Sequence, residues 1–270
     1  MFCVFEKLAA SGRLTMSHTT AWRSILIAFL SIYLILLADW AHAGKLSDQL
    51  VQAAEFGEID KIKTLLNQGV PVNAKDHDGW TALMKAAYEG HQRLVAELIA
   101  RGADVDVQEN AGWTTLMMAA QFGYRDIMNQ LLKQGAQVNT QNNTGATAII
   151  FAALNGHQST LQDLHAAGGD VNIVDHRGRS ALMFAAATGY DALVQKLISL
   201  GADVNTLDNG NNTALILAAK MGHEAVVRIL LSHCADAQVA DSNGKTASKW
   251  AVEKQYSKIF QLLVTATPCD

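Results

Sequence analysis

Histidine and carboxylate side chains are the groups in this sequence that could do acid–base or metal chemistry, and nine histidines are present. Such chemistry needs set spacings: H-E-x-x-H or C-x-x-C for a metal, G-x-S-x-G for a serine nucleophile, and a glycine-rich P-loop for phosphate. The 270 residues contain none of these motifs. The sequence therefore predicts a protein that is not an enzyme and that uses no metal and no cofactor.

Glycine recurs every 33 residues in three rows, and this repeat organises the chain. The first row is Gly79, Gly112, Gly145, Gly178, Asn211 in place of glycine, and Gly244. The second row is Gly57, Gly90, Gly123, Gly156, Gly189 and Gly222, and the third is Gly69, Gly102, Gly135, Gly168 and Gly201, followed by Cys234. Glycine adopts positive φ at no cost and asparagine at little cost. The first row therefore predicts a turn with positive φ in each unit.

A short helix is predicted between the first and second glycine rows. The segments there read TALMKAA, TTLMMAA, TAIIFAA, SALMFAA and TALILAA. The opening Thr or Ser can cap a helix, and the glycine after the segment can end it. The paired alanines, such as Ala119 and Ala120, are small enough for neighbouring helices to approach closely.

A second helix is predicted after the second row, because Leu94, Val95, Leu98 and Ile99 form one apolar stripe at helical spacing. Two short helices and a turn cannot bury their apolar faces alone, whereas a stack of similar units can. The predicted fold class is an all-α repeat, a solenoid of helix-turn-helix units.

These residues resemble ankyrin repeats, whose units read D-x-x-G-x-T-P-L-H-x-A-A-x-x-G-H, a second helix and G-A-D-V-N. The resemblance covers residues 76–240 as five full units of 33 residues. It implies β-turn or hairpin loops between the helix pairs and a function in binding other proteins. The usual His is replaced by Met or Ile, for example by Met84. We therefore expect apolar contact in place of the hydrogen bond that this His makes across the turn.

Incomplete units flank the five repeats and are predicted to cap the solenoid. Residues 44–75 lack the D-x-x-G-x-T turn and are rich in charged side chains. Residues 241–270 keep the turn but place Ser248 and Lys249 where the inner units are apolar. A solenoid needs polar ends to stay soluble. We expect one elongated, monomeric domain without a catalytic module.

The repeat also gives structural roles to the side chains that could bind a metal. Three histidines follow second-row glycines: His91, His157 and His223. Two more occupy one turn position three units apart, too far to share an ion: His77 and His176. The carboxylates of Asp104 and Asp106 belong to the loop of the motif. Five methionines lie at helical spacing, which favours core packing over a soft-metal site: Met84, Met117, Met118, Met128 and Met183.

Residues 1–43 are predicted to be a signal peptide. Ile25–Ala38 is an apolar run preceded by Arg23, and residues 41–43 (Ala-His-Ala) form a cleavage signal that leaves Gly44 first. As a helix the run would rise about 21 Å, less than the roughly 30 Å of a bilayer core. An uncleaved membrane anchor over the same run is the alternative. Counting from Met16 gives a leader of 28 residues, and we expect Met16 to be the true start.

Both alternatives export residues 44–270, and we expect a bacterial periplasm. Such a compartment is oxidising, so Cys234 and Cys269, one repeat plus two residues apart, either form one disulfide or remain two free thiols. Without residues 1–43 the chain has 18 basic and 23 acidic side chains, a net charge of −5. This charge argues against nucleic acid as a partner.

The resemblance places contact residues on the turn tips and on the exposed face of the first helices. Trp80 and Trp113 follow first-row glycines in adjacent units. We expect them side by side on the concave face, with Tyr88, Gln121 and Phe122 beyond them. Tryptophan and tyrosine are enriched at interface hot spots. Packing of each indole on the neighbouring turn, without a partner, is the alternative.

Basic side chains continue this face into the later units: Arg177, Arg179, Lys220 and Lys245. The predicted partner is therefore a protein with an apolar patch and an acidic edge. The leading hypothesis is a non-enzymatic, exported scaffold that mediates protein–protein interaction through its concave face. An exported inhibitor or immunity protein that blocks a toxic enzyme is the alternative.

Overall fold

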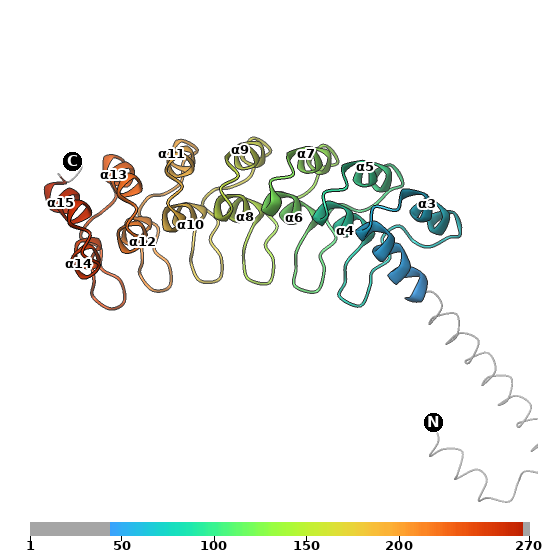
Figure 1. Ribbon diagram of the computed structural model, residues 1–270, viewed down its shortest axis with the longest axis horizontal. Coiled ribbons are helices and arrows are strands. Elements are labelled where there is room, and N and C mark those ends of the chain that lie inside the picture. The colour runs from blue at the N-terminus through green and yellow to red at the C-terminus, as the bar shows by residue number, and fades with distance from the viewer. Residues whose placement is uncertain (1–43, 267–270) are drawn as a thin grey trace, which may run out of the picture.

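The computed structural model describes residues 44–266, which form an arch of stacked helix pairs (Figure 1). A helical segment at residues 44–55 precedes the first pair members that carry labels. The first helices of the units are α4 (Ala82–Tyr88), α6 (Thr115–Phe122), α8 (Ala148–Leu154), α10 (Ala181–Thr188), α12 (Ala214–Met221) and α14 (Ala247–Glu253). The second helices are α3 (Ile59–Asn67), α5 (Gln92–Ala100), α7 (Arg125–Lys133), α9 (Gln158–Ala166), α11 (Asp191–Ser199), α13 (Glu224–Ser232) and α15 (Ser257–Thr265).

The predicted all-α solenoid is confirmed over these residues. Within 44–266 no extended strand forms, and the turns carry only isolated antiparallel bridges such as Lys75 with Thr81. The second helices lie on the outer, convex side of the arch, and the turns project from the inner, concave side (Figure 1). No helix in the described range is long and apolar enough to cross a membrane. The predicted signal peptide or anchor at residues 1–43 lies outside the described residues.

Each first helix begins at the predicted Thr or Ser. The hydroxyl of Thr81 accepts a hydrogen bond from the backbone N–H of Met84 at 3.3 Å, and the same bond recurs at Thr114, Thr147, Ser180, Thr213 and Thr246. The expected loss of a hydrogen bond at Met84 is wrong, because its sulfur accepts from the backbone N–H of Thr81 at 3.5 Å. A thioether is a weak acceptor, so this bond is weaker than one to a ring nitrogen.

The core runs without interruption through the stack because each unit packs on the next. The paired alanines of the five central first helices are completely buried, Ala119 and Ala120 among them. Leu94, Val95 and Leu98 bury the inner stripe of α5. Alanine at the helix contacts lets the backbones approach, so the helices of adjacent units share one continuous core.

Each turn is held by one side chain at its start. Asp76 Oδ1 accepts hydrogen bonds from the backbone N–H groups of Asp78 and Trp80, at 3.0 and 2.9 Å. Backbone bonds also join the tips of successive units, as from Asn110 N to Asp78 O at 3.2 Å and from Asn143 N to Ala111 O at 3.0 Å. The tips therefore form one connected edge along the concave side.

First-row glycines are required for two reasons, of which the sequence predicted one. Gly112 has a φ of 81°, and a Cβ there would lie 2.6 Å from Asn143 Oδ1 and 2.8 Å from its backbone nitrogen. The predicted positive φ of Asn211 is confirmed at 56°. Opposite Asn211 the next turn carries Ser242, a smaller side chain than the Asn that faces Gly112. The smaller neighbour leaves room for the asparagine side chain.

The C-terminal unit is closed by a buried pair. The indole N–H of Trp250 donates to Asp241 Oδ2 at 2.9 Å. Burial of Asp241 opposes ionisation, but hydrogen bonds from Lys245, Trp250 and Asn243 outweigh it and lower the pKa of Asp241. Lys249 is exposed, as expected of a cap.

The outer face of the last unit is mixed rather than wholly polar. Val252 and Val264 are more than half exposed, and Phe260 is 37% exposed. The cap therefore combines the expected polar residues with apolar ones.

We expect Gly112→Ala to destabilise the fold more than Gly135→Ala. Both glycines have positive φ, but nothing lies within 4 Å of a Cβ at Gly135. The backbone cost of about 1 kcal/mol applies to both variants, and crowding against Asn143 adds about 1–3 kcal/mol for Gly112→Ala. Urea unfolding followed by circular dichroism compares the two midpoints. Equal midpoints would show that the tips do not pack as described.

We expect Asp241→Asn to destabilise the protein by about 1–2 kcal/mol at pH 7. The amide NH₂ would face the indole N–H of Trp250. The folded-state pKa of Asp241 is lowered, so its contribution is present above the unfolded pKa of about 3.9 and is lost as pH falls through the folded pKa. Urea midpoints from pH 7 to pH 3 should therefore converge for the two proteins. A difference that stays constant would exclude the carboxylate as its cause.

Candidate functional site

The concave face presents two rows of side chains at 33-residue spacing. One row is the tip residue after each first-row position: Trp80, Trp113, Ala146, Arg179, Asn212 and Lys245. The other lies five residues later, on the first helices: Lys85, Met118, Phe151, Phe184, Leu217 and Trp250. The two rows contact each other, since Arg179 lies over the ring of Phe184 at 4.6 Å and Trp113 stacks on Phe151 at 4.1 Å.

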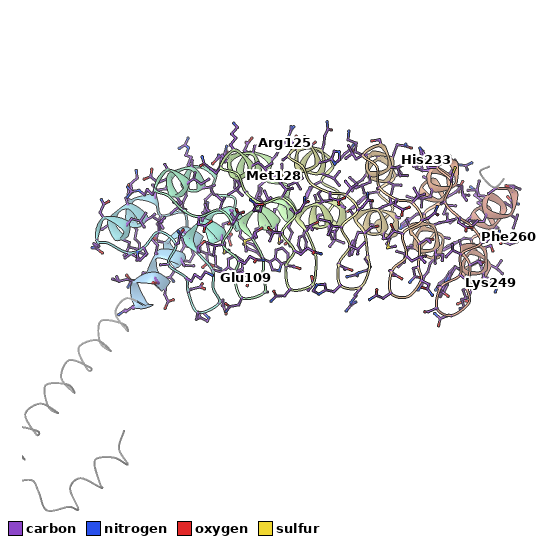
Figure 2. The ribbon with its side chains drawn as sticks, turned by 180° about the vertical axis from the view of Figure 1, so that it is seen from behind. Glu109, Arg125, Met128, His233, Lys249 and Phe260 are labelled. Carbon is purple, nitrogen blue, oxygen red and sulfur yellow. The ribbon has the colours of Figure 1, made fainter. Side chains whose placement is uncertain are left out.

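A hollow of about 330 Å³ opens between the two tryptophans. It is lined by Trp80, Tyr88, Glu109, Ala111, Trp113, Met118 and Gln121. The structure thus brings together four of the residues predicted to form the contact surface: Trp80, Tyr88, Trp113 and Gln121. We call this cavity the tryptophan hollow. Glu109, labelled in Figure 2, lies on the side of the arch from which the turns project.

Phe122 lies beside the tryptophan hollow rather than in it. Its ring meets the edge of Tyr88 at 4.9 Å between centroids and stacks on Tyr124 at 5.6 Å. Tyr88 in turn meets Trp80 edge-on at 5.5 Å. Phe122 therefore fixes the tyrosine that forms one wall.

The alternative of packing without a partner describes only part of each indole. Trp113 covers Phe151 with one face, and Trp80 has the ammonium of Lys85 over its ring at 4.7 Å. Both tryptophans nevertheless remain only half-buried. Among residues 44–266 neither indole N–H finds a hydrogen-bond acceptor, whereas that of Trp250 is bonded to Asp241. Two apolar surfaces and two polar donors are thus left at one place.

The basic residues of the later units are largely paired within the chain. The guanidinium of Arg179 forms an ion pair with buried Asp175 at 2.7 Å. Lys245 pairs with Glu253 and lies over the ring of Trp250, which Lys220 also contacts at 4.3 Å. Arg177 is exposed and has no ion pair within the described range. The uncompensated positive charge on this face is therefore smaller than the sequence implied.

Sequence reasoning missed Glu109, Met118, Phe151 and Phe184 as parts of this face. A signal was available, because these residues share positions in the repeat with tips and helix residues that were considered. What the spacing does not give is the contact between the tip of one unit and the first helix of the next, as between Trp113 and Phe151. That contact depends on how the units are offset in the stack.

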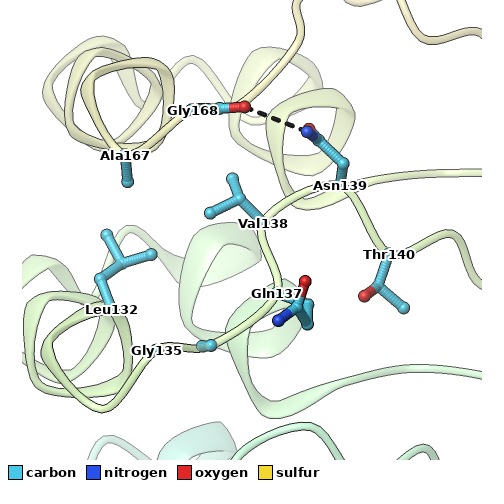
Figure 3. Close-up of a pocket in the computed structure, with 9 residues that line it drawn as sticks. Leu132, Gly135, Gln137, Val138, Asn139, Thr140, Ala167 and Gly168 are labelled. Atoms are coloured by element: carbon cyan, nitrogen blue, oxygen red, sulfur yellow. Dashed lines mark hydrogen bonds between the residues drawn. The ribbon is translucent and has the colours of Figure 1, made fainter.

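A larger hollow of about 640 Å³ lies among the loops that follow the second helices (Figure 3). Its lining residues include no charged and no aromatic side chain. Asn139 spans it structurally, donating to Gly168 O at 3.0 Å and accepting from the backbone N–H of Asp170 at 2.9 Å. This hollow is a gap within the loop ladder, with no group that would select a ligand.

The side chains that could do chemistry have structural partners. Nε2 of His91 lies 2.9 Å from the backbone oxygen of Glu55, and His157 and His223 repeat this contact with the carbonyls of Gln121 and Ala187. Between residues 44 and 266 no three His, Cys, Asp or Glu side chains form a cluster that could hold a metal.

The other candidates are also part of the repeat. All five methionines considered for a metal site are buried in the core. Asp104 and Asp106 accept backbone hydrogen bonds in the loop ladder. Cys234 is disulfide-bonded, whereas Cys269 lies outside the described residues, so the pairing of these two cysteines stays a prediction.

We expect the indole N–H groups of Trp80 and Trp113 to exchange with solvent faster than that of Trp250. Trp250 is 8% exposed and donates to Asp241, so its exchange should be slower by at least about tenfold. Indole resonances, each assigned with a Trp→Phe variant, report the three rates. Equal protection at Trp113 and Trp250 would mean that the tryptophan hollow is closed.

Comparison with known families completes this description. A family model of ankyrin repeats (3 copies) matches residues 50–142, 127–208 and 182–270. A search of curated proteins found no match to the chain. The matched segments overlap and together extend over most of the chain, including every helix from α3 to α15. The chain belongs to the ankyrin-repeat family.

Proposed function

We propose that this protein is a non-enzymatic, exported scaffold that binds another protein through the concave face of its solenoid. Ankyrin repeats generally bind other proteins, and that much follows from the family. The observation that carries the finer proposal is the tryptophan hollow, where two half-buried indoles keep their N–H groups without acceptors in the described chain.

The physical argument is the cost of leaving such a surface in water. An indole brings a large apolar area and one polar donor, which is why tryptophan is enriched among residues that dominate binding energy. Adjacent units place two of them around one cavity of about 330 Å³. A partner side chain in that cavity would cover apolar surface on several sides at once.

Export is the part of the proposal that rests on the sequence alone. The apolar run Ile25–Ala38 and the Ala-His-Ala sequence before Gly44 favour a cleaved signal peptide and a periplasmic protein. The absence of an enzymatic role is proposed because the histidines and carboxylates of the repeats are engaged with backbone groups. We propose a monomer, since the units bury their core against each other.

The test is capture of partners from cell extract, with the envelope and cytoplasmic fractions kept separate. We expect a protein from the envelope fraction to be retained by the wild type and lost by the Trp80→Ala, Trp113→Ala double variant, with affinity reduced at least about thirtyfold. Phe260→Ala, which removes an exposed aromatic ring from the terminal unit, is the matched control and should retain the partner.

Three outcomes separate the hypotheses. One partner held very tightly would favour an inhibitor or immunity protein over a general scaffold. Retention by the double variant would move the binding site away from the tryptophan hollow. A partner found only in the cytoplasmic fraction would overturn the proposed export.

A further inference from the structure

Glu109 breaks the pattern of the turns at the place where the tryptophan hollow opens. The residue that begins each turn is Asp76, Glu109, Asn142, Asp175, Asp208 or Asp241. Asp76 and Asn142 use a single oxygen to accept both turn N–H groups. Glu109 uses both: Oε1 accepts from Trp113 N and Oε2 from Ala111 N, each at 2.8 Å. Its side chain is one methylene longer than aspartate, and it lines the hollow.

The lining of the tryptophan hollow carries one negative charge and no positive charge. Three aromatic rings present π faces or edges there, together with the thioether of Met118 and the amide of Gln121. A carboxylate oxygen that accepts one backbone N–H keeps capacity for further donors. Indole faces attract cations, and a guanidinium most readily, because it is planar and weakly hydrated.

The chain itself contains a filled version of this arrangement two units later. Arg179 occupies the repeat position of Trp113, Asp175 that of Glu109, and Phe184 that of Met118. The guanidinium of Arg179 pairs with Asp175 at 2.7 Å and lies over the ring of Phe184 at 4.6 Å. In that unit an arginine of the chain satisfies both the carboxylate and the aromatic ring.

Other aromatic rings of the concave face are also covered by cations of the chain. Lys85 lies over Trp80, and Lys220 and Lys245 lie over Trp250. Lys85 is drawn toward the preceding unit, where Glu55 is 3.9 Å away, and it does not line the hollow. In the described part of the chain, Glu109 has no ion pair.

From these contacts we infer that the tryptophan hollow binds an arginine side chain of the partner, with the guanidinium against the indoles and an ion pair to Glu109. This inference rests on the proposed function, since it names the group that the same face recognises. The apolar lining covers the methylenes of the arginine, and Glu109 holds its charge. An aliphatic side chain would cover the rings equally well but would bury the carboxylate without a donor, which is unfavourable.

The experiment measures the hollow directly with small probes. The peptide acetyl-Gly-Arg-Gly-amide is titrated into the purified full-length chain while the indole N–H resonances of Trp80, Trp113 and Trp250 are followed. We expect saturable shifts at Trp80 and Trp113 in the millimolar range and none at Trp250. Acetyl-Gly-Leu-Gly-amide and acetyl-Gly-Glu-Gly-amide should bind at least about fivefold more weakly.

Two variants of Glu109 separate charge from turn structure. Glu109→Gln keeps an acceptor for the turn, as Asn142 does, and should weaken arginine binding about fivefold. Glu109→Asp restores the aspartate of the other turns and retracts the carboxylate, so binding should fall between that of the wild type and that of Glu109→Gln. Glu89→Gln removes an exposed carboxylate that does not line the hollow and should change nothing. Unchanged thermal midpoints establish that each variant is folded.

The outcomes are distinct from those of the partner-capture test. Equal binding of the arginine and leucine peptides, or arginine binding unaffected by Glu109→Gln, would overturn the inferred ligand. The protein-binding proposal would survive either result if the double tryptophan variant still lost its partner. If the partner were retained by that variant, the proposed function would fail even with a hollow that binds arginine.

Discussion

Each unit of this solenoid can bury its apolar face only against the next unit, and the rest of the structure depends on that constraint. The alanine pairs of the first helices are completely buried by neighbouring helices, and the backbone tips of adjacent turns are hydrogen-bonded to each other. A glycine such as Gly112 has no room for a Cβ because the next turn is already there. The 33-residue register must therefore hold in the helices and in the turns together.

The same constraint leaves a few positions in each unit free to vary. Tip residues and the helix residues five positions later face the concave side, where the backbone is fixed but the side chain is not. In one unit these positions hold Arg179 and Phe184, which satisfy each other and Asp175. Around Trp80 and Trp113 they hold side chains whose apolar faces and donors are left over. The difference between a closed and an open unit is thus made by a handful of side chains on a constant frame.

Much of the fold could be predicted from the sequence because its determinants are local. The cap at Thr81 and the positive φ at Asn211 depend on residues within one turn, and both were predicted. The candidate site was predicted less completely, since the contact of Trp113 with Phe151 depends on the offset between units. Glu109 was overlooked because aspartate and glutamate look equivalent in a repeat pattern. In the structure one additional methylene places its carboxylate in the hollow.

The central claim is that a protein partner occupies the concave face beside the tryptophan hollow. Site-specific photo-crosslinking in living cells tests it most directly, with a benzophenone amino acid placed either at Ala111, an exposed residue that lines the hollow, or at Gln162, an exposed residue of α9 on the convex side. The account predicts a crosslinked partner from position 111 and none from position 162. Crosslinks from position 162 alone would contradict it.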